Sequence, residues 1–361
     1  MIKLKIIVSA GGSGGHIYPA LAIIKKFQEK EKDLEVLYIG THNRMEKDIV
    51  PNEGINYEAI EIYGFNKSKI FRNIKNIYLI SKAKKRCKEI MKEFKPDVVI
   101  GVGGYVTYPV ISAAHDLNIK TVIHEQNSIP GKSNITLSRL VDLIFVSFKN
   151  SANMFPKNAK IIYSGNPCGD RALTIKKYDK TKLGFSKNKK LIIIVGGSLG
   201  SSTMNEKFKT FLKLVEDEDY EILYITGNDL YDDFKEDKYP KNVKIVPFFE
   251  NLSSIIKESD LIISRAGATT ISEILALKKP SILIPSPYVA NNHQYYNAID
   301  LESMGVSTVI EEKNLNPERL QITINEILND SKKHDEIIKN LNNLKQTSAS
   351  DIIYEEIKKL L

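Results

Sequence analysis

The chain has little cysteine and no long hydrophobic run. Its cysteines, Cys87 and Cys168, are far apart and form neither a C-x-x-C pair nor a Cys/His ligand pattern. This scarcity argues against a disulfide framework and a metal site and favours a reducing cytoplasm. No stretch approaches the roughly 20 apolar residues of a membrane-spanning helix. The N-terminal apolar stretch, only about seven residues long, is interpreted as a first buried strand instead of a signal peptide.

Two common nucleotide-binding motifs are also missing. If Gly12 and Gly14 opened the dinucleotide fingerprint G-x-G-x-x-G, its third glycine would stand at Ile17. The segment PGKSN at 130–134 is not a P-loop either, because Gln126 stands where that motif requires its first glycine. Any phosphate site in this chain must therefore be built differently.

Short β-rich runs alternate with helical stretches along the whole chain. They read KLKIIVS, LEVLYIG, DVVIGVGG and KTVIHEQ in the first half, and KLIIIVGG, EILYITG, VKIVPF, DLIISRAG and PSILIPS in the second. This alternation predicts an α/β fold with doubly wound parallel sheets covered on both faces. Each half opens with a strand and a glycine-rich turn, and a polar segment at 163–190 separates the halves. We predict one domain at 1–163, a second at 164–340, and a C-terminal helix at 341–361 that docks on one of them.

The first glycine-rich loop, AGGSGGH, ends in an ionisable residue. Its backbone at Ser13, Gly14 and Gly15 can approach a ligand closely, beside a helix start whose free N–H groups favour anions. His16 follows where that helix begins. A neutral imidazole there can take a proton from an attacking alcohol, so His16 is the candidate catalytic base. The alternatives are a tight structural turn for the loop and a capping or substrate-contacting role for His16.

Two further loops should lie at the same edge of the first sheet. GVGGYVTYP at 101–109 and HEQNSIPG at 124–131 each follow a predicted strand. The second loop carries polar side chains suited to a hydroxyl-rich ligand, namely His124, Glu125, Gln126 and Asn127. Such residues are also common turn formers.

The second half contains a strand, a tight turn and a helix start in DLIISRAGATTISEILA. Residues Ala268 to Ser272 would present N–H groups and hydroxyls to a diphosphate. Glu273, one turn into the helix, could accept hydrogen bonds from two ribose hydroxyls. The alternative for Glu273 is a favourable interaction with the helix dipole.

Eight ordered motifs carry a resemblance to a known family. They are SAGGSGGHIYPALAI, GTHNRMEKDIVP, KPDVVIGVGGYVTYPV, HEQNSIPG, SGNP, VGGSLGS, SRAGATTISEI and NNHQYYNA, between Ile6 and Ala298. In this order and spacing the chain resembles the lipid II-forming N-acetylglucosaminyltransferases of bacterial peptidoglycan synthesis, in glycosyltransferase family 28. The resemblance covers essentially the whole chain.

The resemblance implies a fold, an activity and a location. The fold would be glycosyltransferase B, two Rossmann-like domains with a cleft between them. The reaction would transfer N-acetylglucosamine, with inversion, from UDP-N-acetylglucosamine to the C4 hydroxyl of undecaprenyl-diphospho-N-acetylmuramoyl-pentapeptide (lipid I), giving lipid II. It would need no metal ion and no cofactor. The enzyme would be peripheral to the cytoplasmic face of the cell membrane, and it would serve cell-wall biogenesis, shape and division, with cell-wall synthesis proteins as candidate partners.

The family also assigns substrate-contacting roles that can be carried over residue by residue. Donor and sugar contacts would come from Ser13, Gly14, Gly15, Asn127, Ser198, Phe249 (through its backbone), Ala268, Thr269, Thr270, Ile271, Ser272, Glu273 and Gln294. Two positions depart from the family pattern. The arginine common two residues after Gly-Asn-Pro is Gly169 here, with Arg171 nearest, and Leu199 precedes Gly200 where glutamine often stands.

Positive charge is concentrated in one segment. The formal charge is +8, and between Tyr63 and Pro96 eleven Lys and Arg residues face two Glu. If residues 70–94 form a helix, Ile80, Ala83, Cys87, Ile90, Met91 and Phe94 share one face, and Ile70, Ile74, Ile77 and Tyr78 share another. The second face, with basic neighbours, is the candidate patch for anionic membrane: Phe65, Lys69, Phe71, Arg72, Ile74, Lys75 and Ile77. A solvated lysine-rich helix is the alternative.

Two other functions remain open at this point. A UDP-N-acetylglucosamine 2-epimerase would share the architecture but need no lipid surface. A noncatalytic nucleotide-sugar-binding subunit would be favoured by replacement of His16 or Glu273, and both residues are present. Nucleic acid is not expected as a partner, because the basic segment is interleaved with aliphatic instead of stacking aromatic residues.

Overall fold

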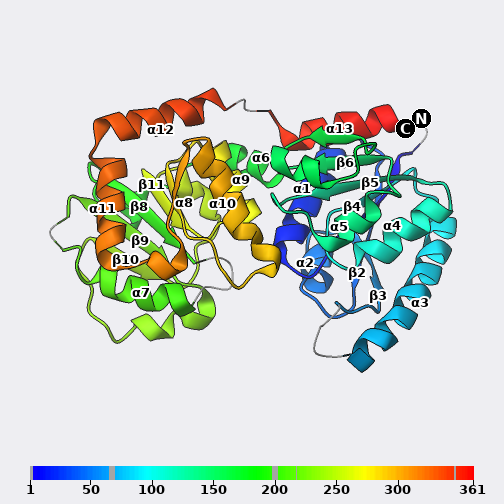
Figure 1. Ribbon diagram of the computed structural model, residues 1–361, viewed down its shortest axis with the longest axis horizontal. Helices are drawn as coiled ribbons and strands as arrows, with labels where there is room; N and C mark the ends of the chain where they lie inside the picture. The colour runs from blue at the N-terminus through cyan, green and yellow to red at the C-terminus, as the bar shows by residue number, and fades with distance from the viewer. Residues whose placement is uncertain (1–2, 65–69, 197–201, 217, 345–346) are drawn as a thin grey trace. The chain divides into compact units, whose positions relative to one another are not determined.

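The structure is a computed structural model that describes residues 3–64, 70–196, 202–216, 218–344 and 347–361, without the side chains of residues 70–72 and 74. Its contacts divide the chain into two compact units (Figure 1). Unit 1 comprises Met1–Cys168 and Thr347–Leu361, and unit 2 comprises Gly169–Gln346. No helix in the described ranges is long and apolar enough to cross a membrane.

Unit 1 is built on a parallel sheet with strand order β3-β2-β1-β4-β5-β6-β7. Its strands are β1 (Lys5–Ser9), β2 (Glu35–Thr41), β3 (Asn56–Ile60), β4 (Val98–Gly101), β5 (Lys120–Glu125), β6 (Leu143–Val146) and β7 (Ile161–Tyr163). The chain moves outward from β1 to β3 and then restarts at β4 on the other side of β1. The carboxyl ends of β1 and β4 therefore form a topological switch point, where open α/β sheets place their ligands.

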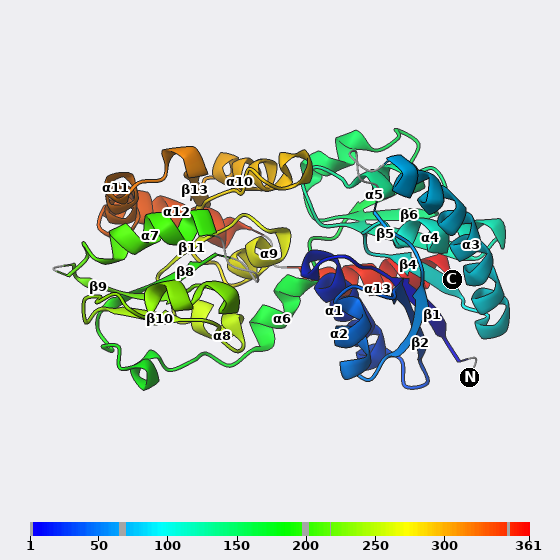
Figure 2. The same ribbon diagram turned by 90° about the horizontal axis from the view of Figure 1, so that it is seen from below.

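Helices cover both faces of this sheet (Figure 2). They are α1 (Gly14–Lys30), α2 (Glu46–Asn52), α3 (Ile70–Phe94), α4 (Thr107–Asp116), α5 (Lys132–Leu137), the 3-10 helix η1 (Lys149–Met154) and α13 (Ala349–Leu360). Successive residues of β1 point to opposite faces, so Ile6 and Val8 join a core with α1 and α13, while Ile7 joins the core under α3 and α4.

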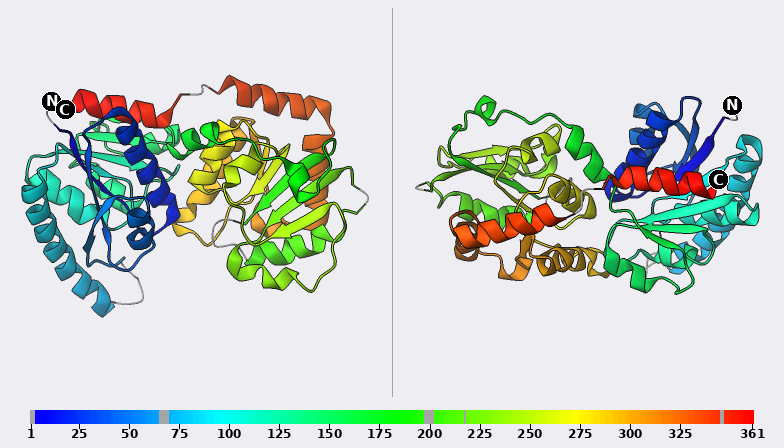
Figure 3. Two further views of the ribbon diagram at one scale, coloured as in Figure 1. Left: turned by 180° about the vertical axis from the view of Figure 1, so that it is seen from behind. Right: turned by 90° about the horizontal axis from the view of Figure 1, so that it is seen from above.

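The C-terminal helix α13 packs on α1 of unit 1 (Figure 3, red). The rings of Phe27 and Tyr354 meet edge to face with centroids 5.1 Å apart. The Tyr354 hydroxyl donates to Glu31 Oε1 at 2.6 Å, and Lys26 forms an ion pair with Asp351 at 3.2 Å. The apolar residues of the last helix are thereby buried against the first domain's first helix.

Unit 2 repeats the plan, with strand order β10-β9-β8-β11-β12-β13. Its strands are β8 (Lys190–Val195), β9 (Tyr220–Ile225), β10 (Val243–Val246), β11 (Leu261–Ser264), β12 (Ser281–Leu283) and β13 (Ser307–Val309). Its α-helices are α6 (Cys168–Thr174), α7 (Ser202–Leu212), α8 (Leu252–Ile256), α9 (Ala268–Ala276), α10 (His293–Ser303), α11 (Pro317–Leu328) and α12 (Ser331–Asn343). The switch point here lies between β8 and β11, so the turn before α9, which follows β11, occupies the position that the loop after β4 has in unit 1.

The two-domain, doubly wound α/β architecture predicted from the sequence is confirmed, and every predicted strand is present. Four strands were not anticipated: β3, β6, β7 and β13. The contacts divide the chain between Cys168 and Gly169, whereas the sequence placed the boundary at residue 164. Cys87 and Cys168 are both buried free thiols.

Candidate functional site

The first glycine loop places His16 on the first turn of α1, just beyond the end of β1. Ser13 is the N-cap residue of α1, in an extended conformation, and its side chain makes no capping hydrogen bond. The His16 Nδ1 atom lies 3.2 Å from the carbonyl oxygen of Gly11 and 3.4 Å from Ser13 Oγ. The half-buried imidazole is thus held by its own loop at one nitrogen.

The loop after β4 packs directly against the first loop. Gly11 N–H donates to the Gly103 carbonyl at 3.3 Å. Gly103 and Gly104 have φ values of +101° and +89°, which favour glycine. A Cβ atom on Gly103 would stand 2.5 Å from His16 Cδ2 and 2.9 Å from Nε2, so the absence of a side chain at 103 keeps that edge of the imidazole uncovered by this loop.

The loop after β5 completes the edge and is joined to the β4 loop. Gln126 Nε2 donates to the Val102 carbonyl at 3.0 Å and to His124 Nδ1 at 2.9 Å. The His124 Nε2–H donates to the Gly165 carbonyl at 3.0 Å. Burial lowers the pKa of His124 to about 4, so this imidazole is neutral and acts as a link within the fold.

Glu125, the last residue of β5, is engaged by the loop that follows it. Its oxygens accept from the backbone N–H groups of Asn127 and Gly131, each at 2.9 Å, and from Asn134 Nδ2 at 2.8 Å. The side chain is buried. It shapes the loop that carries the half-buried Asn127, the predicted sugar contact.

In unit 2 the start of α9 offers unpaired helix N–H groups. The N–H groups of Ala268, Thr269 and Thr270 precede the first intrahelical hydrogen bond, in which Ile271 N–H donates to the Gly267 carbonyl at 2.9 Å. Ile271 differs from the other predicted contacts, because its side chain is 1% exposed and its N–H is used within the helix. The Ser272 hydroxyl donates back to the Thr269 carbonyl at 2.7 Å.

Glu273 lies one turn further along α9 and is half-buried. Its Oε1 accepts from the hydroxyl of Ser253 at 2.8 Å. Burial raises the pKa of Glu273, opposed by the Ser253 hydrogen bond and the Arg171 charge. Arg171, the arginine nearest to the Gly-Asn-Pro motif, is therefore electrostatically coupled to this carboxylate.

Two further predicted donor residues described in unit 2 are Phe249, after β10, and Gln294, in the first turn of α10. Phe249 is half-buried, and its ring meets that of Tyr178 edge to face with centroids 5.1 Å apart. Gln294 Oε1 accepts from Ser286 N–H at 2.9 Å, close to the start of α10. Ser198 lies outside the described residues.

The candidate membrane patch can be described only in part. On α3 one of the two apolar faces packs in the core, because Ala83, Cys87, Ile90 and Met91 are buried. On the other face Ile77 is 61% exposed, Tyr78 is 68% exposed and Lys75 is exposed. Phe65 and Lys69 lie outside the described residues, as do the side chains of Phe71, Arg72 and Ile74.

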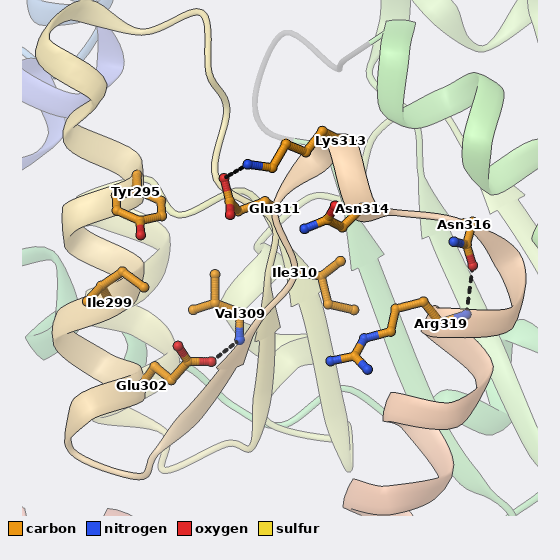
Figure 4. Close-up of a pocket in the computed structure, with 10 residues that line it drawn as sticks. All are labelled: Tyr295, Ile299, Glu302, Val309, Ile310, Glu311, Lys313, Asn314, Asn316 and Arg319. Carbon is orange, nitrogen blue, oxygen red and sulfur yellow. Dashed lines mark hydrogen bonds and ion pairs between the residues drawn. The ribbon is translucent and has the colours of Figure 1, made fainter.

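A cavity of about 610 Å³ lies elsewhere in unit 2, between α10, β13 and the start of α11 (Figure 4). The residues lining it include Tyr295, Glu302, Lys313 and Arg319, and none of the predicted donor contacts. Glu302 is used within the wall, where its Oε1 accepts from Val309 N–H at 2.8 Å. Over the described part of the chain, no group of three or more His, Cys, Asp or Glu side chains could hold a metal ion.

Sequence reasoning missed one buried carboxylate of the unit 1 site. Glu46, in the first turn of α2, is fully buried and accepts from Gly12 N–H of the first glycine loop at 3.1 Å. An acidic residue in a first helical turn ordinarily indicates only a favourable dipole interaction. A link to a loop 34 residues away has no local sequence signal.

Family comparisons match both units. The glycosyltransferase family 28 N-terminal domain matches residues 6–146, and the glycosyltransferase family 28 C-terminal domain matches residues 191–354. A protein of Halalkalibacterium halodurans is 45% identical over 330 residues, 90% of this chain and 91% of its own. A protein of Caldanaerobacter subterraneus is 42% identical over 362 residues, 98% of this chain and 99% of its own. Both are named UDP-N-acetylglucosamine–N-acetylmuramyl-(pentapeptide) pyrophosphoryl-undecaprenol N-acetylglucosamine transferase.

Solved structures agree with this assignment. MurG of Acinetobacter baumannii matches with a TM-score of 0.79 and 28% identity, covering 99% of each chain. The UDP-GlcNAc 2-epimerase of Methanocaldococcus jannaschii matches with a TM-score of 0.66 and 15% identity, covering 99% of this chain and 100% of its own. At that identity the second likeness concerns the fold alone.

Proposed function

The chain belongs to glycosyltransferase family 28, and from that premise we propose that it transfers N-acetylglucosamine from UDP-N-acetylglucosamine to N-acetylmuramyl-(pentapeptide) pyrophosphoryl-undecaprenol. The observation that carries this conclusion is identity above 40% with transferases of that name over nearly the full length of both chains. Each unit has a glycosyltransferase B-type Rossmann-like sheet, with the loop that carries His16 at the switch point of unit 1 and the start of α9 at that of unit 2.

The chemistry assigned to unit 1 is proton removal from the acceptor. His16 would take the proton of the muramoyl C4 hydroxyl as its oxygen attacks the anomeric carbon of the donor, in a single displacement that inverts this centre. The glycines at 11, 12, 103 and 104 leave the loops around His16 without side chains at these positions. This permits close approach of substrate backbone and hydroxyl groups to the imidazole.

Unit 2 would hold the donor. The N–H groups at the start of α9 suit the diphosphate of UDP and stabilise the charge that develops on it as the sugar departs. Glu273 would accept from ribose hydroxyls, Phe249 would offer backbone atoms to uracil, and Gln294 would contact the sugar. No metal ion is assigned a part in these steps.

The direct test uses labelled UDP-N-acetylglucosamine, the purified protein and the lipid-linked acceptor, followed by analysis of the lipid fraction. Label in the lipid fraction, dependent on the acceptor, is the expected result. Conversion of the donor to its 2-epimer without acceptor would instead indicate an isomerase, and binding without turnover would indicate a noncatalytic subunit.

Replacing Glu273 with alanine is expected to weaken UDP and UDP-N-acetylglucosamine binding by the same amount, because the ribose is common to both. Hydrogen bonds to a charged group contribute about 1.5–3 kcal/mol. Calorimetric titration with each ligand measures the effect. Ser253→Ala is the matched control, since it removes the hydroxyl bound to Glu273 but leaves the carboxylate. Unchanged UDP affinity in Glu273→Ala would remove this residue from the donor site.

We also propose that unit 1 docks on the cytoplasmic face of the cell membrane through the exposed apolar face of α3 and its basic neighbours. Each lysine or arginine near an anionic leaflet contributes about 1 kcal/mol, so a few suffice for reversible docking. The exposed side chains of Ile77 and Tyr78 would enter the interface, with Lys75 beside them.

The triple change Ile77→Ser, Tyr78→Ser and Lys75→Glu is expected to abolish co-sedimentation with anionic vesicles while turnover of a soluble short-chain acceptor stays within about twofold. The control is Leu214→Ser in unit 2. Leu214 is 68% exposed, as Tyr78 is, but it lies far along the chain from α3. Vesicle binding that survives the triple change would place the docking surface elsewhere.

A further inference from the structure

Glu46 is a buried carboxylate for which the transfer reaction, as described above, has no use. It is fully buried at the start of α2. One oxygen, Oε2, accepts from Gly12 N–H at 3.1 Å. The other, Oε1, accepts from Thr41 at the end of β2, from its N–H at 3.2 Å and its hydroxyl at 2.6 Å. The carboxylate therefore ties the first glycine loop to the neighbouring strand.

The backbone N–H that Glu46 binds and the backbone carbonyl that contacts His16 belong to the same peptide unit. The N–H of Gly12 and the C=O of Gly11 belong to one peptide, which is planar and trans, so the two bonds point in opposite directions. Fixing the N–H toward Glu46 orients the carbonyl, whose oxygen lies 3.2 Å from His16 Nδ1. Gly12 has a φ of +90°, so glycine's freedom allows other orientations of this peptide.

Two groups compete for His16 Nδ1, and they demand opposite tautomers. The Gly11 carbonyl oxygen can only accept, so its contact requires a proton on Nδ1. The Ser13 hydroxyl, 3.4 Å away, can donate to an unprotonated Nδ1, which would place the proton on Nε2. In a neutral imidazole only the first arrangement leaves Nε2 as a proton acceptor.

We propose that Glu46 is a positioning residue that sets the tautomer of His16. By holding the Gly11–Gly12 peptide, it keeps the Gly11 carbonyl on Nδ1, so that Nδ1 carries the proton and Nε2 is the basic nitrogen. The loop after β4 is compatible with this orientation because residue 104 is glycine. A Cβ atom at that position would collide with the Gly11 carbonyl oxygen. The catalytic consequence rests on the proposed function, in which His16 is the base, whereas the tautomer itself does not.

The test is ¹⁵N NMR of the imidazole nitrogens in the ligand-free full chain, assigned with His16→Gln. Wild type is expected to show His16 mainly as the Nδ1–H tautomer. Glu46→Gln keeps the side-chain volume but cannot accept from both Gly12 and Thr41, so the Nε2–H fraction should increase severalfold. Adding Ser13→Ala to Glu46→Gln removes the competing donor and should restore Nδ1–H. Glu58→Gln, which alters an exposed carboxylate paired with Arg86, is the control.

Kinetics provide the second measurement. Glu46→Gln is expected to lower kcat about tenfold, less than the loss of the base itself, without changing the Kd for UDP. A wild-type Nε2–H tautomer, or an unchanged tautomer ratio in folded Glu46→Gln, overturns the proposal. If Glu46→Gln does not fold, Thr41→Val loosens the carboxylate at its other oxygen, and an unchanged ratio there overturns the proposal as well. A tautomer shift in a protein that transfers no sugar would instead reject the proposed function.

Discussion

Replacing His16 with alanine is expected to lower kcat by about 10²- to 10⁴-fold, which is the usual contribution of a general base. Affinity for UDP-N-acetylglucosamine should change little, because the donor is assigned mainly to unit 2 and the base acts on the acceptor in the transition state. Steady-state kinetics with the lipid-linked acceptor and calorimetric titration with the donor separate the two quantities. His115→Ala, which removes an exposed imidazole from α4 of the same unit, should change neither.

The pH profile supplies an independent check on this role. An imidazole base imposes an acid limb on kcat/KM, and that limb should be absent in His16→Ala. If the variant loses donor affinity while kcat is preserved, His16 is a binding residue. Glu125 would then be a poor substitute, because its two oxygens already accept hydrogen bonds from Asn127, Gly131 and Asn134.

Much of the fold could be predicted because the strands at the centre of each sheet are apolar on both faces. Runs such as KIIVS and KLIIIV are buried almost throughout, and a glycine-rich stretch follows each of them in the sequence. Of the missed strands, β6 (LIFV) is likewise apolar and buried throughout, whereas β3, β7 and β13 lack this signal. β3 reads NYEAI and has exposed positions, and β7 and β13 are three residues long. They complete the edges of sheets whose register is set by their neighbours, so their formation depends on pairing more than on local pattern.

The candidate site was predictable to the extent that it consists of backbone. Glycine loops and helix starts have recognisable sequence patterns. The structure places His16, Gly103 and Gly104 together at the unit 1 switch point. The side chains that hold these loops were not predictable. Glu46 and Gln126 each bind backbone in a loop that is distant in sequence, by 34 and 24 residues. Such pairs come into contact only in the tertiary fold, so no local sequence pattern predicts them.

The stability of unit 1 is expected to depend on pH through the buried imidazole of His124. Its native pKa is about 4, against about 6.5 for an unperturbed histidine, because burial penalises the charged form. Above about pH 6.5 the imidazole is neutral in both the native and the unfolded state, so it adds no pH dependence to the free energy of unfolding. As the pH falls from there toward 4, the unfolded chain binds a proton that the native state does not. Stability is therefore lost over this window, by about 3 kcal/mol in total.

The hydrogen bonds around His124 explain why the native state resists that proton. His124 Nδ1 accepts a hydrogen bond from Gln126 Nε2. Protonation of Nδ1 would place its N–H opposite the Gln126 N–H, and two donors cannot form a hydrogen bond. Turning the Gln126 amide to relieve this would sacrifice its hydrogen bonds to the carbonyls of Val102 and His124. The acid form thus disturbs the contact between the β4 and β5 loops that flank the candidate site.

The measurement compares wild type with His124→Gln, whose amide can keep a donor toward the Gly165 carbonyl but does not titrate. Hydrogen exchange of the β5 amides between about pH 7 and pH 4 reports the unfolding free energy of unit 1 itself, which matters because a chain of two units need not unfold in one step. Wild type should lose about 3 kcal/mol more than the variant over this range. His115→Gln, at an exposed position of α4, should follow wild type. Parallel pH profiles for wild type and His124→Gln would show that His124 carries no proton-linked stability and that its burial is relieved by water in solution.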